Sequence, residues 1–243
     1  MEIILFSEMM IPKDASAISL LILGFVLGLW HAKDPDHLAA VSTIVSERKS
    51  LLSSTIIGGF WGIGHTISLL IVGILVIFLK LQISEEVEGY LEAGVGIMLV
   101  LLGLNALRKV FQSEKIHLHQ HQHNGREHLH LHTHADEKAE ENHHFLKFSP
   151  RAVLVGMIHG LAGSAAVMLL IIPTISSPVL ALVYVLIFGI GSIGGMMIMS
   201  FMIGLPFHFT ADKFLQFNKV IKVIAGIFSF GLGLFIIYEK LFA

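Results

Sequence analysis

The segment His31-Ala32-Lys33-Asp34-Pro35-Asp36-His37 lies inside an otherwise apolar stretch that runs from Ala15 to Val45. Two imidazoles, two carboxylates and an ammonium group are costly in hydrocarbon, and they are found there when they face the protein interior or a hydrated pathway. Pro35 removes one backbone donor and clashes with the carbonyl of residue 31, so the helix is expected to open at His31. We therefore expect the function of the chain to depend on this segment.

The rest of the chain has the composition of a membrane protein. Of its 243 residues, 54% are hydrophobic and 14% are charged, and the mean hydropathy is +0.78. A soluble domain is rarely so apolar. Stretches long enough to cross a bilayer occur at residues 16–46, 51–79, 90–111, 151–172, 178–204 and 218–238. The sequence predicts an all-α integral membrane protein with six transmembrane helices.

The lysine and arginine residues predict how the chain is oriented. Twelve of them lie in or beside the loops that follow the first, third and fifth stretches, against three on the other side. Such loops face the cytoplasm, so we expect a multi-pass protein of the cytoplasmic (inner) membrane, with both termini outside and the 112–150 loop inside. The first residues lack the features of a removable signal peptide. The chain has no cysteine, which excludes disulfides and thiolate ligands.

The two halves of the chain match each other when shifted by roughly 128 positions, a search that precedes any fold assignment. Residues 26–31 match 154–159, ending in His31 and His159, and residues 62–65 match 189–192. Each half has three helices, so the second half enters the membrane from the opposite side. This is the 3+3 inverted repeat of many secondary transporters. We expect one repeat at 1–111, a His-rich loop at 112–150 between helices 3 and 4, and the other repeat at 151–243.

The charged cluster breaks this symmetry. Where the first half has Asp34, Asp36 and His37, the second half has Ala162, Ser164 and Ala165. Transporters built from inverted repeats bind their substrate near the midplane, between the repeats. We therefore expect a single asymmetric site that is formed largely by the first half.

The residue types of the cluster indicate a metal ion. On an ideal helix His31, Asp34 and His37 would share an arc of about 120° while Asp36 would point elsewhere. A helix distorted at Pro35 would allow either carboxylate to bind the metal while the other orients an imidazole. Imidazole nitrogen and carboxylate oxygen without thiolate suit nickel, cobalt or zinc.

Two histidines outside the segment are further candidate ligands. His65 lies among Gly62, Gly64 and Thr66 on the second predicted helix, where small neighbours allow a helix or an ion to come close. His159 is the counterpart of His31 in the second half. The alternative for both is hydrogen bonding between helices.

The 112–150 loop contains ten of the 15 histidines of the chain. Short His-rich tracts bind metals, and the polar composition of this loop predicts disorder in the absence of metal. We expect low-affinity metal binding that buffers or senses the ion on the cytoplasmic side; the alternative is a solvated linker. The predicted ligands are His117, His119, His121, His123, His128, His130, His132 and His134.

These motifs resemble those of the nickel/cobalt permease (NiCoT) superfamily. The segment from His31 to His37 matches its His-x4-Asp-His signature, and the residues around His65 and Thr66 resemble its Gly-His-Ser/Thr motif. The segment that begins at His159 is similar to the six-helix UreH-type branch of nickel transporters. The resemblance implies that His31, Asp36 and His37 are essential for transport, with His65 supporting them. It also implies a nickel-enzyme maturation system, for urease or hydrogenase, as a partner. The Asp-Thr-Ala-Thr-Glu motif of the eight-helix uptake permeases is absent from the second half.

We therefore predict a permease, not an enzyme, that takes up Ni²⁺ and by extension Co²⁺ through a His/Asp site at the midplane. Its partners are the divalent ion and the lipid bilayer; neither a nucleic acid nor a cofactor is expected. The alternatives are a nickel/cobalt efflux transporter of the same fold and a membrane-anchored metal sensor or storage protein. A more distant one is a membrane acyltransferase, since the spacing from His31 to Asp36 also fits the His-x4-Asp pattern of those enzymes.

Overall fold

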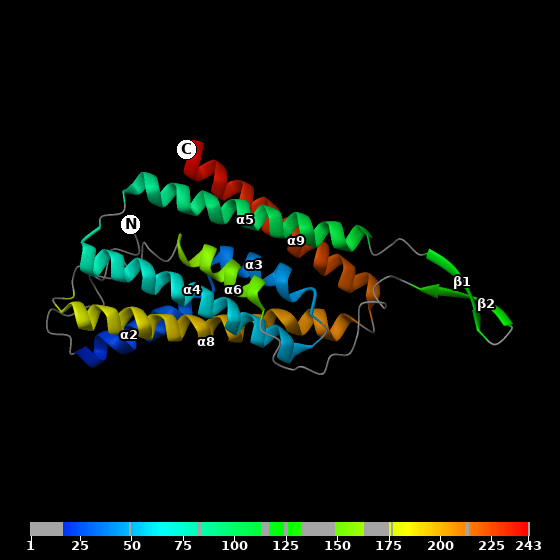
Figure 1. Ribbon diagram of the computed structural model, residues 1–243, viewed down its shortest axis with the longest axis horizontal. Helices are drawn as coiled ribbons and strands as arrows, with labels where there is room; N and C mark the ends of the chain where they lie inside the picture. The colour runs from blue at the N-terminus through cyan, green and yellow to red at the C-terminus, as the bar shows by residue number, and fades with distance from the viewer. Residues whose placement is uncertain are drawn as a thin grey trace.

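The computed structural model describes residues 17–48, 50–81, 84–112, 117–123, 126–132, 149–162, 175, 177–211 and 214–242. They form seven helices and one pair of strands (Figure 1). The elements are α2 (Ala17–His31), α3 (Pro35–Val45), α4 (Leu51–Leu79), α5 (Glu85–Gln112), β1 (His117–His123), β2 (Arg126–His132), α6 (Pro150–Gly160), α8 (Pro178–Ala211) and α9 (Leu215–Phe242).

Among the described residues, α4, α5, α8 and α9 are each long and apolar enough to cross a membrane, and α2 with α3 makes a fifth, broken span. These correspond to five of the six predicted stretches. Of the remaining stretch, 151–172, the structure describes α6 and the two residues after it, and residues 163–172 lie outside the described residues. The chain is therefore an all-helical, multi-pass membrane protein, with four or five candidate spans in the part that the structure describes.

The first span is broken where Pro35 predicted that it would open. α2 ends at His31, α3 begins at Pro35, and the two helix axes differ by 56°. Asp34 precedes Pro35 with an extended ψ of 142°, which is the conformation that a following proline favours. The break is complete, so the arc of an ideal helix does not describe this segment.

The helices pack in pairs around two short central ones. α4 packs against α8, and α5 packs against α9. Figure 1 shows α3 and α6 between these two pairs, with α2 alongside α8. α3 also contacts α5, α8 and α9, and α6 contacts α4 and α5. The short helices thus carry the residues near His37 and His159 into the centre of the bundle.

Glycines allow the paired helices to approach closely, as is common between membrane helices. A Cβ atom on Gly96 would lie 2.8 Å from the carbonyl oxygen of Gly233, and one on Gly103 would lie 2.6 Å from that of Gly226. α5 and α9 are therefore in backbone contact at two levels.

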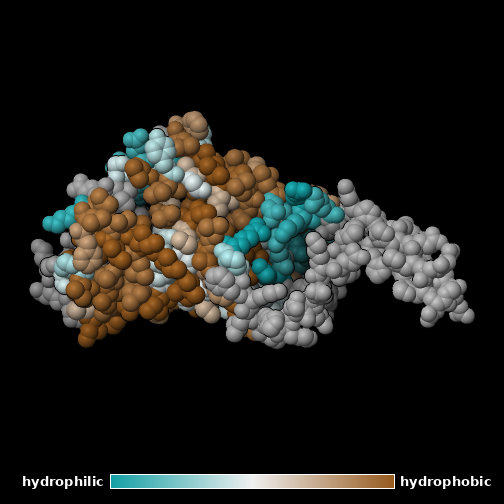
Figure 2. Space-filling view, in the orientation of Figure 1, coloured by the Kyte–Doolittle hydropathy of each residue, from teal (hydrophilic) through white to brown (hydrophobic). Residues whose placement is uncertain are grey.

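The outward faces of the long helices carry large apolar side chains. Exposed examples are Ile18 on α2, Ile71 on α4, Leu101 on α5 and Phe235 on α9. Figure 2 shows this hydrophobic surface extending over most of the visible face of the bundle. An exposed apolar surface of this extent fits contact with lipid.

Strands β1 and β2 form an antiparallel hairpin beyond one end of the bundle (Figure 1). Its register pairs His117 with His132, His119 with His130 and His121 with His128. The structure describes two seven-residue strands in this loop, and the disorder that the sequence predicts for the loop in the absence of metal stays a prediction. The remaining residues 113–116, 124–125 and 133–148, which include His134, lie outside the described residues. The division of the chain at 112 and 150 stays a prediction.

Candidate metal centre

Six polar residues from four helices and one turn meet in the centre of the bundle. His31 ends α2, Asp34 lies in the turn after it, and Asp36 and His37 lie in the first turn of α3. His65 comes from α4 and His159 from the end of α6. All four histidines are buried, and His65 is fully inaccessible to solvent. The structure thus brings together all six residues that the sequence predicted for the transport site, and their role as ligands stays a prediction.

The four imidazoles lie against one another. The ring centroid of His37 is 4.5 Å from that of His31, 5.4 Å from that of His65 and 4.1 Å from that of His159. His31 and His65 are 5.3 Å apart. His37 is therefore the central ring of the cluster.

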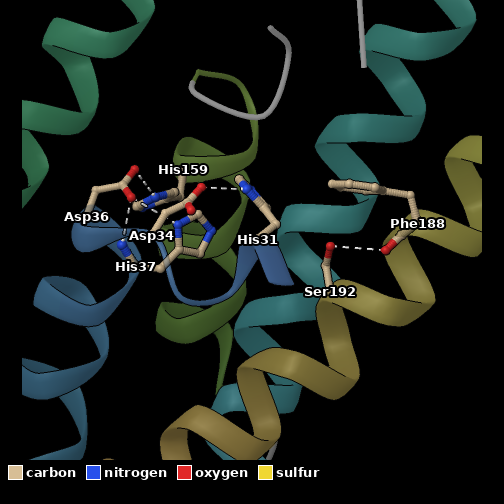
Figure 3. Close-up of polar contacts among 7 residues, drawn as sticks. All are labelled: His31, Asp34, Asp36, His37, His159, Phe188 and Ser192. Carbon is tan, nitrogen blue, oxygen red and sulfur yellow. Dashed lines mark hydrogen bonds and ion pairs between the residues drawn. The ribbon is translucent and has the colours of Figure 1, made fainter. Parts of the chain in front are cut away.

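Asp36 holds two of these rings in position. Its Oδ2 atom accepts a hydrogen bond from Nε2 of His159 at 2.8 Å, and its Oδ1 atom accepts one from Nδ1 of His37 at 3.2 Å (Figure 3). The carboxylate thus links the two halves of the chain. The helical arc had placed Asp36 away from His31 and His37, and it lies inside the cluster because the helix restarts at Pro35.

Asp34 has a smaller role than Asp36 in this geometry. Its Oδ2 atom lies 2.7 Å from Nδ1 of His31, and its side chain is 46% exposed, against 23% for Asp36. Both carboxylates therefore bind imidazole nitrogens. A carboxylate that accepts the N–H of an imidazole orients the ring and makes its other nitrogen more basic, as is usual at metal sites.

Five ring nitrogens in the cluster are buried and, within the described part of the chain, have no hydrogen-bond partner. They are Nε2 of His31, Nε2 of His37, Nδ1 of His159 and both nitrogens of His65. A buried polar atom without a partner costs roughly 1–3 kcal/mol. Metal coordination would satisfy one nitrogen of each ring, since a neutral imidazole offers a lone pair on one nitrogen and carries N–H on the other.

These donors form two groups that could each hold an ion. His31, His37 and His65 make one group, and Asp36, His37 and His159 make the other; within each group the ligand atoms lie within 4.8 Å of one another. His37 belongs to both. Nitrogen and oxygen donors of this kind suit nickel, cobalt or zinc.

Two aromatic residues that the sequence analysis did not select line the cluster. The Trp61 ring centroid lies 5.2 Å from that of His37 and 5.6 Å from that of His159. Phe188 on α8 lies 5.7 Å from His31, and Ser192 donates a hydrogen bond to the Phe188 carbonyl at 3.0 Å (Figure 3). Trp61 precedes His65 by four residues, so the helical period was the signal that places both on one face of α4.

The backbone of α6 comes close to α4 beside the site. Ser68 donates a hydrogen bond to the carbonyl of Met157 at 2.8 Å. A Cβ atom on Gly160 would lie 2.5 Å from the carbonyl oxygen of His65. His65 and His159 are therefore fixed relative to each other by backbone contacts of their helices.

The two carboxylates should differ in their effect on metal binding. We expect Asp36→Asn to weaken Ni²⁺ binding by about 10- to 100-fold, the usual range for a residue that orients a metal-binding histidine. Asp34→Asn should cost less than about tenfold, because Asp34 contacts one ring and is half exposed. Calorimetric titration of the purified protein with Ni²⁺ measures both. A larger loss for Asp34→Asn would contradict this ranking.

The loop histidines predicted as further ligands are not part of this cluster as far as the structure describes them. Those on β1 and β2 are described by their backbone alone, and His134 lies outside the described residues. Their metal binding stays a prediction.

Comparison with known proteins identifies relatives along most of the chain. A sequence model of the family NicO, described as a high-affinity nickel-transport protein, matches residues 17–236. The urease accessory protein UreH of Bacillus sp. (strain TB-90) is 42% identical over 229 residues, which cover 91% of this chain and 92% of that protein. The chloroplast protein FOR GROWTH AND FERTILITY 2 of Arabidopsis thaliana is 26% identical over 221 residues, which cover 90% of this chain and 56% of that protein. No solved structure matches the chain.

Proposed function

The chain belongs to the NicO family of high-affinity nickel-transport proteins, and from this premise we propose that it takes up Ni²⁺, and with it Co²⁺, across the cytoplasmic membrane. A transporter family is not an enzyme family, so the acyltransferase alternative that rested on His31 and Asp36 is set aside. The ion is the substrate, and the residues of the central cluster are its ligands on the way through.

The unpartnered imidazole nitrogens carry this proposal. Four buried histidines with five such nitrogens would be an unfavourable core for any protein that did not bind a ligand there. In this proposal they replace the water molecules of the hydrated ion. The carboxylates of Asp34 and Asp36 hold the rings and offset part of the charge of the ion.

The two overlapping groups of donors provide a route within the cluster. An ion held by His31, His37 and His65 can move to Asp36, His37 and His159 without leaving His37. Exchanging ligands one at a time avoids a fully stripped ion in a low-dielectric interior, which would be strongly unfavourable. This supports a site that passes an ion on rather than one that stores it.

The inverted repeat is also part of the proposal. In the sequence match, His31 corresponds to His159 and Trp61 corresponds to Phe188. The ring centroids of His31 and Phe188 lie 5.7 Å apart, and those of His159 and Trp61 lie 5.6 Å apart. If each residue is replaced by its counterpart in the other half, the first contact becomes the second. The contacts Gly96–Gly233 and Gly103–Gly226 between α5 and α9 are counterparts in the same sense, since Gly96 matches Gly226 and Gly103 matches Gly233. These pairs support two structurally equivalent halves that rock about the central site.

The direction of transport and the orientation rest on charge and on the name of a relative. The turn after α3, the hairpin and the start of α9 lie at the same end of the bundle (Figure 1), and the basic residues there favour a cytoplasmic location. A relative bears the name urease accessory protein. We propose by analogy that this chain supplies nickel to a urease maturation system, which requires uptake; efflux is the alternative.

Flux measured in proteoliposomes tests the function. We expect saturable ⁶³Ni²⁺ entry into liposomes that contain the intact chain, and inhibition of that entry by unlabelled Co²⁺. Liposomes without protein provide the background. Entry at the background rate, with tight nickel binding retained, would contradict a permease and favour the sensor or storage alternative.

Deletion of the His-rich loop separates transport from storage. Without residues 114–146 we expect the transmembrane part to fold and to transport ⁶³Ni²⁺, while the number of ions bound per chain falls because the loop donors are gone. Flux and equilibrium dialysis on the same preparation measure the two properties. Loss of all transport together with an unchanged fold would make the loop the functional part.

A further inference from the structure

The charged segment between α2 and α3 includes one group that the proposed transport site does not use. Lys33 lies in the turn that separates the two helices, directly before Asp34. An ammonium group in an apolar segment is costly and marks a candidate for function. It also bears on nickel binding, because a cation beside Asp34 and Asp36 would compete with the ion for their negative charge.

Two pairs of residues, each three positions apart, occupy this turn. The backbone amide of Lys33 donates to the carbonyl of Trp30 at 3.0 Å, and that of Asp34 donates to the carbonyl of His31 at 3.1 Å. The side chains pair in the same way. Lys33 Nζ lies 3.6 Å from the centroid of the Trp30 ring, and Asp34 Oδ2 lies 2.7 Å from His31 Nδ1 (Figure 3). The second pair belongs to the histidine cluster, whereas Trp30 is 64% exposed on the outside of the bundle.

The ammonium of Lys33 has a second position within reach, beside the carboxylates. In the described part of the chain, the ion-pair partners of Asp34 and Asp36 are histidines of the cluster and not Lys33. Lys33 is nevertheless the neighbour of Asp34 in sequence, and its four-carbon stem is flexible. The Asp34 side chain is also 46% exposed, so it is open to an approaching cation. The contact with Trp30 therefore holds the ammonium in one of two positions.

The charge that the cluster offers to an ion depends on which position the ammonium takes. Two carboxylates match the two charges of a divalent ion, and buried charges are tolerated when they are paired. With the ammonium beside Asp34, the carboxylates would already be partly neutralised and the ion would be repelled at short range. Over Trp30 the ammonium is instead attracted by the negative face of the indole ring. The position of Lys33 thus sets how much negative charge is left for the ion.

We propose that Trp30 keeps the Lys33 ammonium off the two carboxylates and so leaves them available to the divalent ion. Trp30 is then a positioning residue that acts through Lys33, and Lys33 is an internal cation that competes with the ion. Tryptophan is the aromatic side chain that holds a cation best. The inference rests on the proposed function in one respect, that the central cluster binds nickel.

Calorimetric titration of the purified full-length chain with Ni²⁺ tests the role of Trp30. Without the indole ring the ammonium lies beside the carboxylates more often, and the apparent affinity falls with the fraction of chains that remain competent to bind. The strength of a cation–π contact limits this loss, so Trp30→Leu should bind Ni²⁺ about two- to 30-fold more weakly. Trp30→Phe should lie between that variant and the unchanged chain. Phe25→Leu is the matched control, since Phe25 is another exposed aromatic residue of α2, and it should keep the affinity.

Removing the cation separates this role from a structural one. Lys33→Gln should bind Ni²⁺ at least as tightly as the unchanged chain, and the addition of Trp30→Leu to it should cause no further loss. All variants should keep the thermal unfolding temperature of the ion-free protein. An equal loss from Trp30→Leu with and without Lys33 would overturn the proposal and leave Trp30 as a lipid-facing residue only; so would an unchanged affinity of Trp30→Leu. Absence of nickel binding by the unchanged chain would contradict the proposed function itself, and this inference with it.

Discussion

Replacing His37 with alanine should abolish saturable nickel transport. His37 is the central ring of the cluster, belongs to both groups of donors, and has its Nε2 atom buried without a partner in the described structure. The substitution therefore removes one ligand from each of the two donor groups that could hold the ion. We expect Ni²⁺ affinity to fall more than about 100-fold, beyond the 10- to 100-fold typical of residues that orient a ligand. ⁶³Ni²⁺ flux into proteoliposomes and calorimetric titration measure the two effects.

A histidine outside the cluster provides the control. His208 is exposed near the end of α8, and His208→Ala should leave flux and affinity unchanged. Both variants should elute as the unchanged protein does in size-exclusion chromatography, because the other three histidines and their carboxylates remain. A folded His37→Ala protein that carried nickel at the normal rate would remove the central cluster from the transport pathway.

The cluster could be anticipated from sequence because charged residues are rare in apolar segments. The histidines and charged residues of the stretch from Ala15 to Val45 all lie between His31 and His37, and the cost of such groups in a bilayer marks them as functional candidates. Pro35 likewise predicted the break between α2 and α3, since a proline cannot continue the hydrogen bonding of the preceding turn. The repeat aligned His31 with His159, which directed attention to a residue 128 positions away that lies in the same cluster.

The position of Asp36 could not be obtained in the same way. An ideal helix directs it away from His31, and its contact with His159 depends on the 56° bend. The size of a bend follows from the packing of α3 against α5, α8 and α9, which involves residues far apart in sequence. Phe188 was missed for the same reason, because its contact with His31 requires the register of α2 against α8.

The extent of α6 was also beyond local reasoning. The apolar stretch 151–172 reads as one span by length and hydropathy, and the structure describes α6, which ends at Gly160, and the two residues after it. The span as a whole stays a prediction. His159 lies in the last turn of α6, so this helix end is part of the histidine cluster.

Replacing Gly156 with valine should destabilise the protein and abolish transport together. A Cβ atom at Gly156 would overlap the carbonyl oxygen of Trp61 and would lie 2.8 Å from its Cδ1 atom. The backbone of α4 has little room to move aside, because the Ser68–Met157 hydrogen bond and the close approach of Gly160 to His65 hold the same two helices together within the next two turns. Overpacking of a tight contact costs roughly 1–3 kcal/mol, and a clash with backbone should reach at least the upper end of that range.

The same substitution at an open position separates this clash from the general effect of a β-branched residue in a helix. Gly231 on α9 has no atom of the described structure within 4 Å of an added Cβ, and valine is a slightly better helix former than glycine. Gly231→Val should therefore leave the thermal unfolding temperature and ⁶³Ni²⁺ flux near those of the unchanged protein, while Gly156→Val lowers both. Because Gly156 has no side-chain atom that could bind the ion, loss of nickel binding in that variant would come from displacement of Trp61 and His159. Equal behaviour of the two variants would show that close contact between α4 and α6 is not required to hold the cluster.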